Sequence, residues 1–66
     1  MNVRLNGEPR TLDPGTTLTE LVESITGSTR GSAVVVDDEV VPRGSWPAFT
    51  LRDGQRVELI TAVQGG

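Results

Sequence analysis

Apolar and polar side chains alternate over the first residues of the chain. Every second position of residues 1–5 is apolar, which is the period of a β-strand with one covered face. Asn6 and Gly7 follow, and both tolerate the positive φ angles of a type I′ hairpin turn. A return strand over residues 8–12 is therefore predicted, at a sheet edge because Pro9 has no N–H to donate to a neighbouring strand.

The next apolar pattern has the period of an amphipathic helix, and both of its ends are marked. Thr17 and Glu20 have the spacing of a capping box, in which each side chain accepts a hydrogen bond from the other residue's backbone N–H. Gly27 is typical of a residue that ends a helix in the left-handed conformation. The apolar residues between these ends form one stripe: Leu18, Leu21, Val22 and Ile25.

The second half of the chain has the pattern of short strands separated by turns. Residues 33–36 are rich in valine, and this run predicts a strand that is buried on both faces. Residues 37–39 are predicted to form a turn, and residues 40–41 to begin a short partner strand. Residues 43–49 are expected to be irregular or to form a single helical turn, and the last strand is predicted over residues 56–63.

The order of these elements, β-β-α-β-β-β, points to one fold class. A hairpin, a crossover helix and a last strand that can insert beside the first give a mixed sheet of four or five strands packed on one main helix. This α+β arrangement is the β-grasp, or ubiquitin-like, fold; the alternative is a small open α+β sheet of different strand order. A chain of 66 residues is expected to form one domain, over residues 1–63, followed by a flexible, reactive tail over residues 64–66.

Composition narrows the function mainly through the residue types that are missing. Six basic and nine acidic side chains give a net charge of −3, which argues against nucleic acid because phosphates require a basic surface. The sequence has no Cys, His, Lys or Tyr, so only hydroxyls, scattered carboxylates and the two chain termini remain for chemistry. No apolar run approaches the ~18 residues that span a membrane. We therefore expect a cytoplasmic carrier or binding module that holds no metal, and neither an enzyme nor a membrane protein.

Three other features of the sequence are assigned structural roles. The acidic residues Asp37, Asp38 and Glu39 lack the spaced ligands and the distal Glu of a calcium loop, so a solvated turn is predicted. Trp46 is expected to close the core as a lid and not to form a binding surface. Arg43 is expected to be solvated or locally paired, and not to contact a partner carboxylate.

The C-terminal Gly65 and Gly66 form the candidate reactive group. A terminal carboxylate is ionised at neutral pH and can attack the α-phosphate of ATP on a partner enzyme, which gives an acyl-adenylate open to sulfur or amine nucleophiles. Because neither glycine has a β-carbon, the backbone is narrow enough to enter a slot that other residues would block. The alternative is an incidental flexible end, but a Gly-Gly end directly after a strand of this topology favours a carrier.

The residues from 35 to 66 read VVDDEVVPRGSWPAFTLRDGQRVELITAVQGG, and they resemble the ThiS sulfur carriers of thiamin biosynthesis. The shared pattern is a Val-rich strand, a turn, V-P-R at 41–43, Trp46, then Asp-Gly and an apolar strand that ends in Gly-Gly. The N-terminal half, with its Asn-Gly hairpin and its T-L-x-E-L helix start, is similar as well. The sequence departs from the family pattern only in turns, at residues 37–38 and at Gln55.

The resemblance implies that the chemistry is divided between this chain and its partners. A ThiF-type adenylase would adenylate the Gly66 carboxylate with ATP and magnesium, and a sulfur-donating persulfide protein would convert it to a thiocarboxylate. A ThiG-type thiazole synthase would then take the sulfur for the thiazole ring of thiamin. The chain itself would bind no cofactor and would not be an enzyme. The alternatives are a MoaD-type carrier for molybdopterin synthesis and a non-catalytic β-grasp interaction module with an incidental Gly-Gly end.

The last strand also predicts a docking face for such partners. Val57 and Leu59 should point toward the helix stripe, so Ile60, one residue out of phase, should point away from it. An apolar side chain on the open face is a candidate partner contact; the alternative is that it only covers the sheet beside neighbouring strands. Glu58, the acidic residue of this face, is expected to steer the approach of partners through its charge. The predicted partner-binding residues are Ile60, Val63, Glu58 and Gln64.

Overall fold

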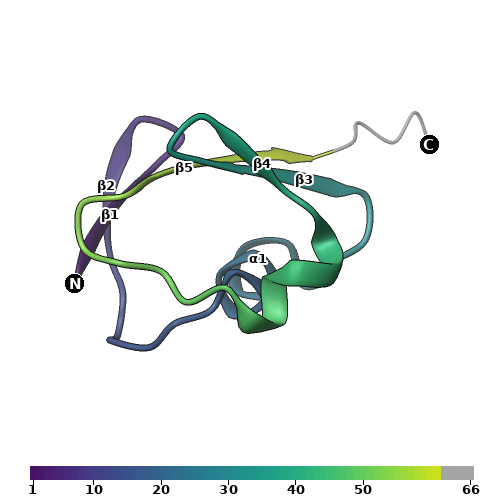
Figure 1. Cartoon of the computed structure of the whole chain (residues 1–66), viewed down its shortest axis with the longest axis horizontal. Coiled ribbons are helices and arrows are strands. Elements are labelled where there is room, and N and C mark those ends of the chain that lie inside the picture. Colours follow the sequence, from purple (N-terminus) through teal and green to yellow (C-terminus); the bar gives the residue numbers. More distant parts are fainter. Residues whose placement is uncertain (62–66) are drawn as a thin grey trace.

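A computed structural model describes residues 1–61 of the chain, and within that range it shows a five-stranded sheet and one main helix (Figure 1). The strands lie in the order β2-β1-β5-β3-β4, with β1 and β5 parallel and the other neighbours antiparallel. This is the mixed sheet of the β-grasp fold, so the predicted fold class is confirmed. The elements are β1 (Asn2–Leu5), β2 (Glu8–Thr11), α1 (Leu18–Thr26), β3 (Ser32–Val36), β4 (Glu39–Val41), the 3-10 helix η1 (Arg43–Ala48) and β5 (Arg56–Thr61).

The hairpin of β1 and β2 forms as its turn residues predict. Asn6 and Gly7 have φ angles of 51° and 84°, which are the positive values that a type I′ turn requires. Pro9 pairs with Arg4 on β2, and β2 is an edge strand of the sheet. A residue without an N–H is tolerated there because no further strand pairs with it.

Helix α1 begins and ends at the residues that the sequence indicates. The Thr17 hydroxyl accepts from Glu20 N–H at 3.2 Å, and Glu20 Oε1 accepts from Thr17 N–H at 2.9 Å, so the capping box is complete. Gly27 ends the helix with a φ of 77°. Ile25 is a correction to the predicted stripe, since its side chain is 38% exposed and lies outside the buried core. It stands in the last turn of α1, whereas the buried residues Leu18, Leu21 and Val22 lie in the first half of the helix.

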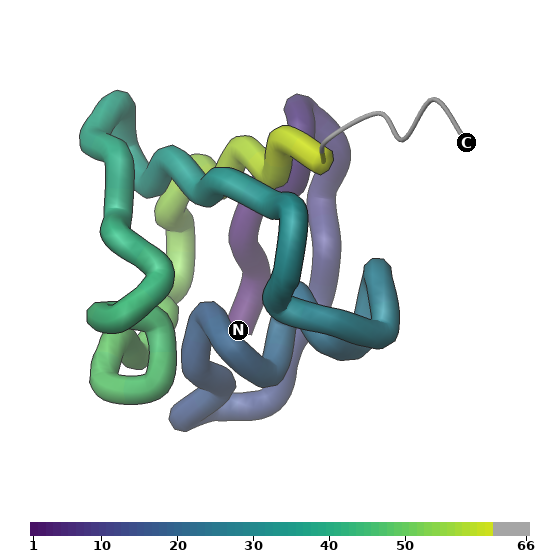
Figure 2. The backbone as a smooth tube through the Cα atoms, turned by 90° about the vertical axis from the view of Figure 1, so that its right-hand side faces the viewer, coloured from purple at the N-terminus to yellow at the C-terminus, as the bar shows by residue number. Residues whose placement is uncertain are grey.

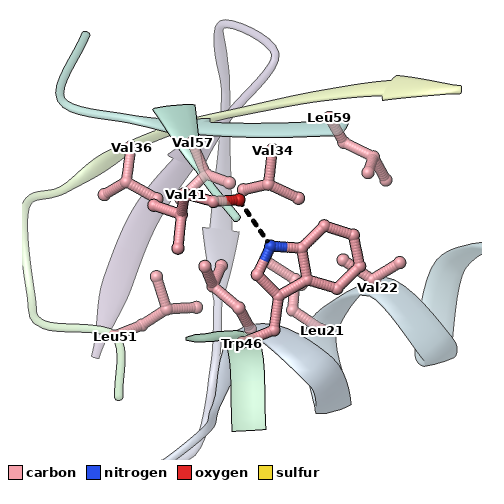
Figure 3. Packing of buried hydrophobic residues seen from close by; sticks show 10 residues of the cluster. Leu21, Val22, Val34, Val36, Val41, Trp46, Leu51, Val57 and Leu59 are labelled. Carbon is pink, nitrogen blue, oxygen red and sulfur yellow. Dashed lines mark hydrogen bonds between the residues drawn. The ribbon is translucent and has the colours of Figure 1, made fainter. Parts of the chain in front are cut away.

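The core lies between the sheet and a layer made of α1 and η1, and both views show the two helices on the same side of the strands (Figures 1 and 2). Trp46 of η1 is 1% exposed, and its indole Nε1–H donates to the Val41 carbonyl oxygen at 2.8 Å (Figure 3). Its prediction as a core lid is confirmed, and the bond satisfies the indole N–H. The buried apolar residues are Val3, Leu18, Leu21, Val22, Val34, Val36, Val41, Trp46, Leu51, Val57 and Leu59.

The prediction that the valine-rich strand is buried on both faces is wrong. In β3, Val34 and Val36 are buried, whereas Ala33 is exposed and Val35 is only half-buried. The reason is that both helices cover one face of the sheet and none of the described elements covers the other (Figure 1). The strand also begins one residue earlier than predicted, at Ser32. No helix within residues 1–61 has the length and apolar character needed to cross a membrane.

Candidate functional site

Strand β5 is the centre of the candidate site because it lies between β1 and β3 and leads toward the C-terminus. Its side chains alternate as predicted: Val57 and Leu59 face the core, with exposures of 1% and 9%, whereas Glu58 is exposed. Ile60 is 57% exposed, so the predicted phase of this strand is confirmed. An isoleucine that remains open to water in a folded domain is available for contact with another protein.

Within residues 1–61, the open face of β3, β4 and β5 has four apolar residues, which we call the open-face patch: Ala33, Val35, Val40 and Ile60. Ala33 lies opposite Ile60 in the register of β3 and β5, and Val35 lies opposite Val40 in the register of β3 and β4. Because Ala33 and Val35 are two residues apart on one strand, their side chains share a face and the patch is continuous. Val40 is 72% exposed, so the patch extends to the edge strand β4.

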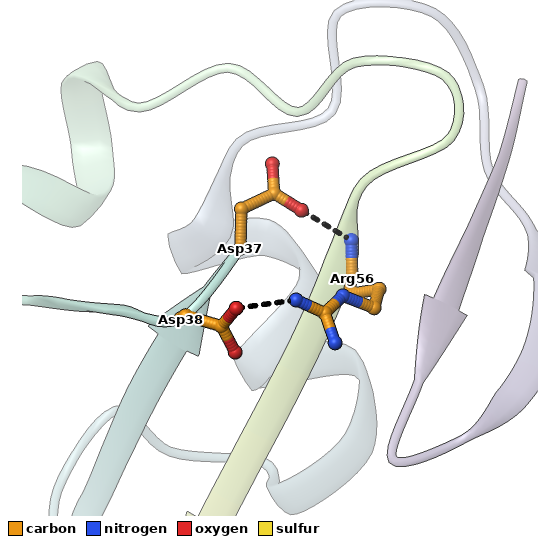
Figure 4. Close-up of polar contacts among 3 residues, drawn as sticks. All are labelled: Asp37, Asp38 and Arg56. Carbon is orange, nitrogen blue, oxygen red and sulfur yellow. Dashed lines mark hydrogen bonds and ion pairs between the residues drawn. The ribbon is translucent and has the colours of Figure 1, made fainter.

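The start of β5 carries an ion pair on this side of the sheet. Arg56 Nη2 lies 2.6 Å from Asp38 Oδ2, and the Arg56 backbone N–H donates to Asp37 Oδ1 at 3.0 Å (Figure 4). Both side chains of the ion pair are largely exposed, so water and salt weaken their attraction. Glu58, the next charged residue of the strand, lies opposite Val35 and borders the open-face patch.

The acidic segment 37–39 is a turn, as predicted, with one difference. Asp37 and Asp38 have φ angles of 49° and 71° and form the turn, whereas Glu39 is already the first residue of β4. The Asp37 and Asp38 carboxylates accept hydrogen bonds from the backbone N–H and the guanidinium of Arg56, respectively. Within residues 1–61 there is no group of three His, Cys, Asp or Glu side chains placed to hold a metal ion. Arg43 is exposed at the start of η1.

The end of β5 has a contact that sequence reasoning missed. The carboxamide of Asn6, in the β1–β2 turn, forms hydrogen bonds with both the N–H and the carbonyl of Leu59. The two residues are 53 positions apart, so no local pattern links them. The Asn-Gly dipeptide indicates the turn but not what the asparagine side chain contacts.

Four of the predicted site residues lie outside the described range. They are Val63, Gln64, Gly65 and Gly66. The predicted strand end at residue 63 is beyond that range as well, and β5 is described to Thr61. The roles predicted for Ile60, Glu58 and these four residues stay predictions; the structure adds that Ile60 and Glu58 share the open face of the sheet.

Residues 3–66 match the sequence model of the ThiS family. The chain belongs to the ThiS family. It is 42% identical over 64 residues to the sulfur carrier protein ThiS of Thermus thermophilus, a match that covers 97% of this chain and 98% of the relative. The sulfur carrier protein ThiS of Escherichia coli is 27% identical over 66 residues, and both chains are covered completely. The family resemblance seen in the sequence is therefore confirmed.

Solved structures of ThiS proteins have the same fold. A crystal structure of thiamine biosynthesis protein ThiS from Geobacter metallireducens superimposes with a TM-score of 0.82 at 32% identity, and the match covers both chains completely. A different kind of relative is the thiazole synthase of Magnetococcus marinus, which is 33% identical over 66 residues. That match spans this whole chain but only 20% of the synthase.

Proposed function

We propose that this chain is a sulfur carrier for thiamin biosynthesis and that its Gly66 carboxylate carries the sulfur as a thiocarboxylate. The observation that supports this most directly is the ThiS family match, which runs from residue 3 to residue 66 and so includes the Gly-Gly end. The relatives of similar length, from Thermus thermophilus and Escherichia coli, are named sulfur carrier proteins. A family match of this extent favours ThiS over a MoaD-type carrier and over an interaction module with an incidental Gly-Gly end.

The proposed chemistry has three steps: adenylation, attack by a persulfide and release by a thiol. A carboxylate oxygen of Gly66 attacks the α-phosphorus of ATP, and pyrophosphate leaves with magnesium. The terminal sulfur of a persulfide then attacks the acyl carbon, the C–O bond to AMP breaks, and an acyl disulfide forms. A thiol finally attacks the cysteine sulfur of the persulfide protein, so that a disulfide forms between this thiol and that cysteine, the S–S bond of the acyl disulfide breaks, and the thiocarboxylate remains on Gly66.

The side chains of the carrier indicate that its partners supply the catalytic groups. The sequence contains no Cys, His or Lys, so it offers no side-chain thiolate, imidazole or amine to act as a nucleophile or a general base. The chain therefore acts as a substrate of its partners and binds no cofactor of its own. ATP and magnesium bind to a ThiF-type adenylase, and the sulfur comes from a persulfide protein.

The open-face patch is the proposed docking surface for these partners. Ile60 is exposed on β5, the strand that leads to Gly66, its apolar neighbours lie beside it on β3 and β4, and Glu58 borders them with a negative charge. Apolar residues at the centre of an interface supply most of its binding energy, whereas charged rims steer association. Val63 and Gln64 belong to the same proposal because they lie between Ile60 and the reactive end in the sequence.

A ThiG-type thiazole synthase is the proposed acceptor of the sulfur. Proteins named thiazole synthase from Magnetococcus marinus and Paramagnetospirillum magneticum each contain a stretch that matches this whole chain over 20% of their length. A covalent link between two modules raises their effective concentration for each other, which is useful when they must meet repeatedly. This supports a thiazole synthase as a partner of the separate chain as well.

Adenylation can be tested by ATP–pyrophosphate exchange with a ThiF-type adenylase. We expect exchange to depend on the carrier and to fall to background when Gly66 is deleted or replaced in Gly66→Ala. Gly44→Ala is the matched control, since a Cβ at Gly44 meets nothing within 4 Å and its exchange should equal that of the wild type. Exchange that persists without Gly66 would contradict the proposed function.

A further inference from the structure

Asn6 lies in the turn between β1 and β2, yet its side chain binds the last part of β5. Its Oδ1 accepts a hydrogen bond from the Leu59 N–H at 2.8 Å, and its Nδ2 donates to the Leu59 carbonyl oxygen at 3.2 Å. One side chain therefore holds both polar backbone groups of one residue of β5. A contact of this kind fixes the backbone at Leu59 and not only the position of a side chain.

These two bonds continue the parallel ladder between β1 and β5. Along β1, the Arg4 N–H donates to the Gln55 carbonyl at 2.9 Å, and the Asn6 N–H donates to the Val57 carbonyl at 2.8 Å. At Asn6 the backbone enters the left-handed region, with a φ of 51°, and turns away toward β2. The carboxamide, which has the donor and acceptor of a peptide group, takes the place of the departing backbone at Leu59.

The position of this contact matters because it is near the end of β5. On one side, β3 pairs with β5 as far as Ser32 and Thr61. On the other side, the residue pairs of β1 and β5 end at Leu5 and Val57. Within the described part of the chain, the Asn6 side chain extends the hydrogen bonds on the β1 side of β5 by two residues, from Val57 to Leu59.

We infer that Asn6 is a positioning residue for the sulfur-carrier reaction, because its carboxamide fixes the end of the strand from which the chain continues to Gly66. This inference rests on the proposed function. A partner that docks on the open face must receive the Gly66 carboxylate at one place relative to that face. A fixed starting point reduces the volume that the carboxylate samples, which raises its effective concentration at the reaction site.

If Asn6 only stabilised the fold, removing its contact and removing a similar contact at the opposite end of β5 would lower kcat equally. The opposite end of β5 therefore supplies the control. Asp37 also has a positive φ, of 49°, and its Oδ1 accepts a hydrogen bond from the Arg56 N–H at 3.0 Å. Asn6→Gly and Asp37→Gly each remove a side-chain contact with the β5 backbone and keep a residue that tolerates positive φ. One variant releases the end of β5 and the other releases its start.

The experiment combines hydrogen exchange of the free carrier with steady-state adenylation by a ThiF-type adenylase, well below the melting midpoint of each variant. In Asn6→Gly we expect faster amide exchange at Leu59, and a kcat about tenfold lower with the KM for the carrier unchanged. Asp37→Gly should keep the wild-type kcat. Asn6→Asp, which retains the acceptor for the Leu59 N–H, should lie between the wild type and Asn6→Gly.

Three results would overturn the positioning role while leaving the carrier function in place. These are a wild-type kcat in Asn6→Gly, an equal loss of kcat in both glycine variants, and a change confined to KM. If the wild-type chain is not adenylated at all, the proposed function fails and the positioning role fails with it. Faster amide exchange at Leu59 in Asn6→Gly would then still show that the contact anchors β5. This result distinguishes a failure of the proposed function from a failure of the contact to hold the strand.

Discussion

The two faces of the sheet use the same strands for different purposes. On the face covered by α1 and η1, Val34 and Val57 are 0% and 1% exposed, and they pack with Trp46. On the opposite face, Val40 and Ile60 are 72% and 57% exposed. Because neighbouring residues of a strand point to opposite faces, a change of one position moves a side chain from the core to the surface. The covered face therefore determines stability, and the open face stays accessible for the proposed contact with partner proteins.

The largest effect on stability is expected on the covered face. Trp46→Ala removes the largest fully buried side chain and its bond to the Val41 carbonyl, and should cost about 3–5 kcal/mol of unfolding free energy. Urea titration followed by circular dichroism would measure it. Trp46→Phe should cost less than Trp46→Ala, because it keeps one buried aromatic ring, although it loses the N–H bond and part of the buried volume. A loss below about 1 kcal/mol in Trp46→Ala would contradict a core role.

A charge on the open face should have the reverse effect, with little loss of stability and a large loss of binding. Ile60→Asp should change the unfolding free energy by no more than about 0.5 kcal/mol. It should weaken binding of the adenylase or the thiazole synthase by about 2 kcal/mol, measured by calorimetry. Ile25→Asp is the control, since Ile25 is also exposed but lies on α1 and should leave partner affinity unchanged.

Unchanged affinity in a stable Ile60→Asp variant would remove the open face from the docking proposal. A collapse of its melting midpoint would instead place Ile60 in the core. Val40→Asp tests how far the surface extends, because Val40 lies at the β4 edge of the open-face patch. A smaller loss of affinity there than at Ile60 is expected if the contact is centred near the end of β5.

The start of α1 should show a smaller effect, confined to stability. Thr17→Ala removes the hydroxyl that accepts from Glu20 N–H, which should cost about 1 kcal/mol. Thr17→Ser keeps an oxygen at the same position and should recover most of this loss. Chemical denaturation of the two variants would measure the difference, and equal stabilities of Thr17→Ala and the wild type would show that the cap contributes nothing.

The smallest effect is expected at the exposed ion pair. Asp38→Asn keeps a residue that tolerates the φ of 71° and removes the charge that faces Arg56. We expect a loss of about 0.5 kcal/mol or less, and a smaller one at high salt, because both partners are largely exposed. Thermal melting at two salt concentrations would measure it. A loss that is large and independent of salt would indicate a structural role beyond the ion pair.

The parts of the fold that were predictable are those with local signals. The Asn6-Gly7 turn, the Thr17–Glu20 capping box and the Gly27 helix end each depend on residues within four positions of one another. The predicted phase of β5 followed from alternation along one strand. Each of these features is determined by residues that are close together in the sequence.

The features that were missed or predicted wrongly depend on how elements that are distant in the sequence pack together. A run of valines looks the same whether one or both faces are covered, so the open face of β3 could not be inferred from Ala33 and Val35. The exposure of Ile25 in the last turn of α1 depends on which parts of the helix the rest of the fold covers. The contact of Asn6 with Leu59 joins residues 53 positions apart, which only the parallel pairing of β1 and β5 brings together.

Mass spectrometry of the carrier after incubation with the adenylase, ATP, magnesium and a persulfide donor tests the central claim most directly. The carrier should gain the mass that corresponds to replacing one oxygen by sulfur, and fragmentation should place this change on the residue Gly66. Ile60→Asp should fold normally and convert more slowly, because its defect lies in docking. Added sulfur found on a residue other than Gly66, or equal conversion of a chain that lacks Gly66, would contradict the account.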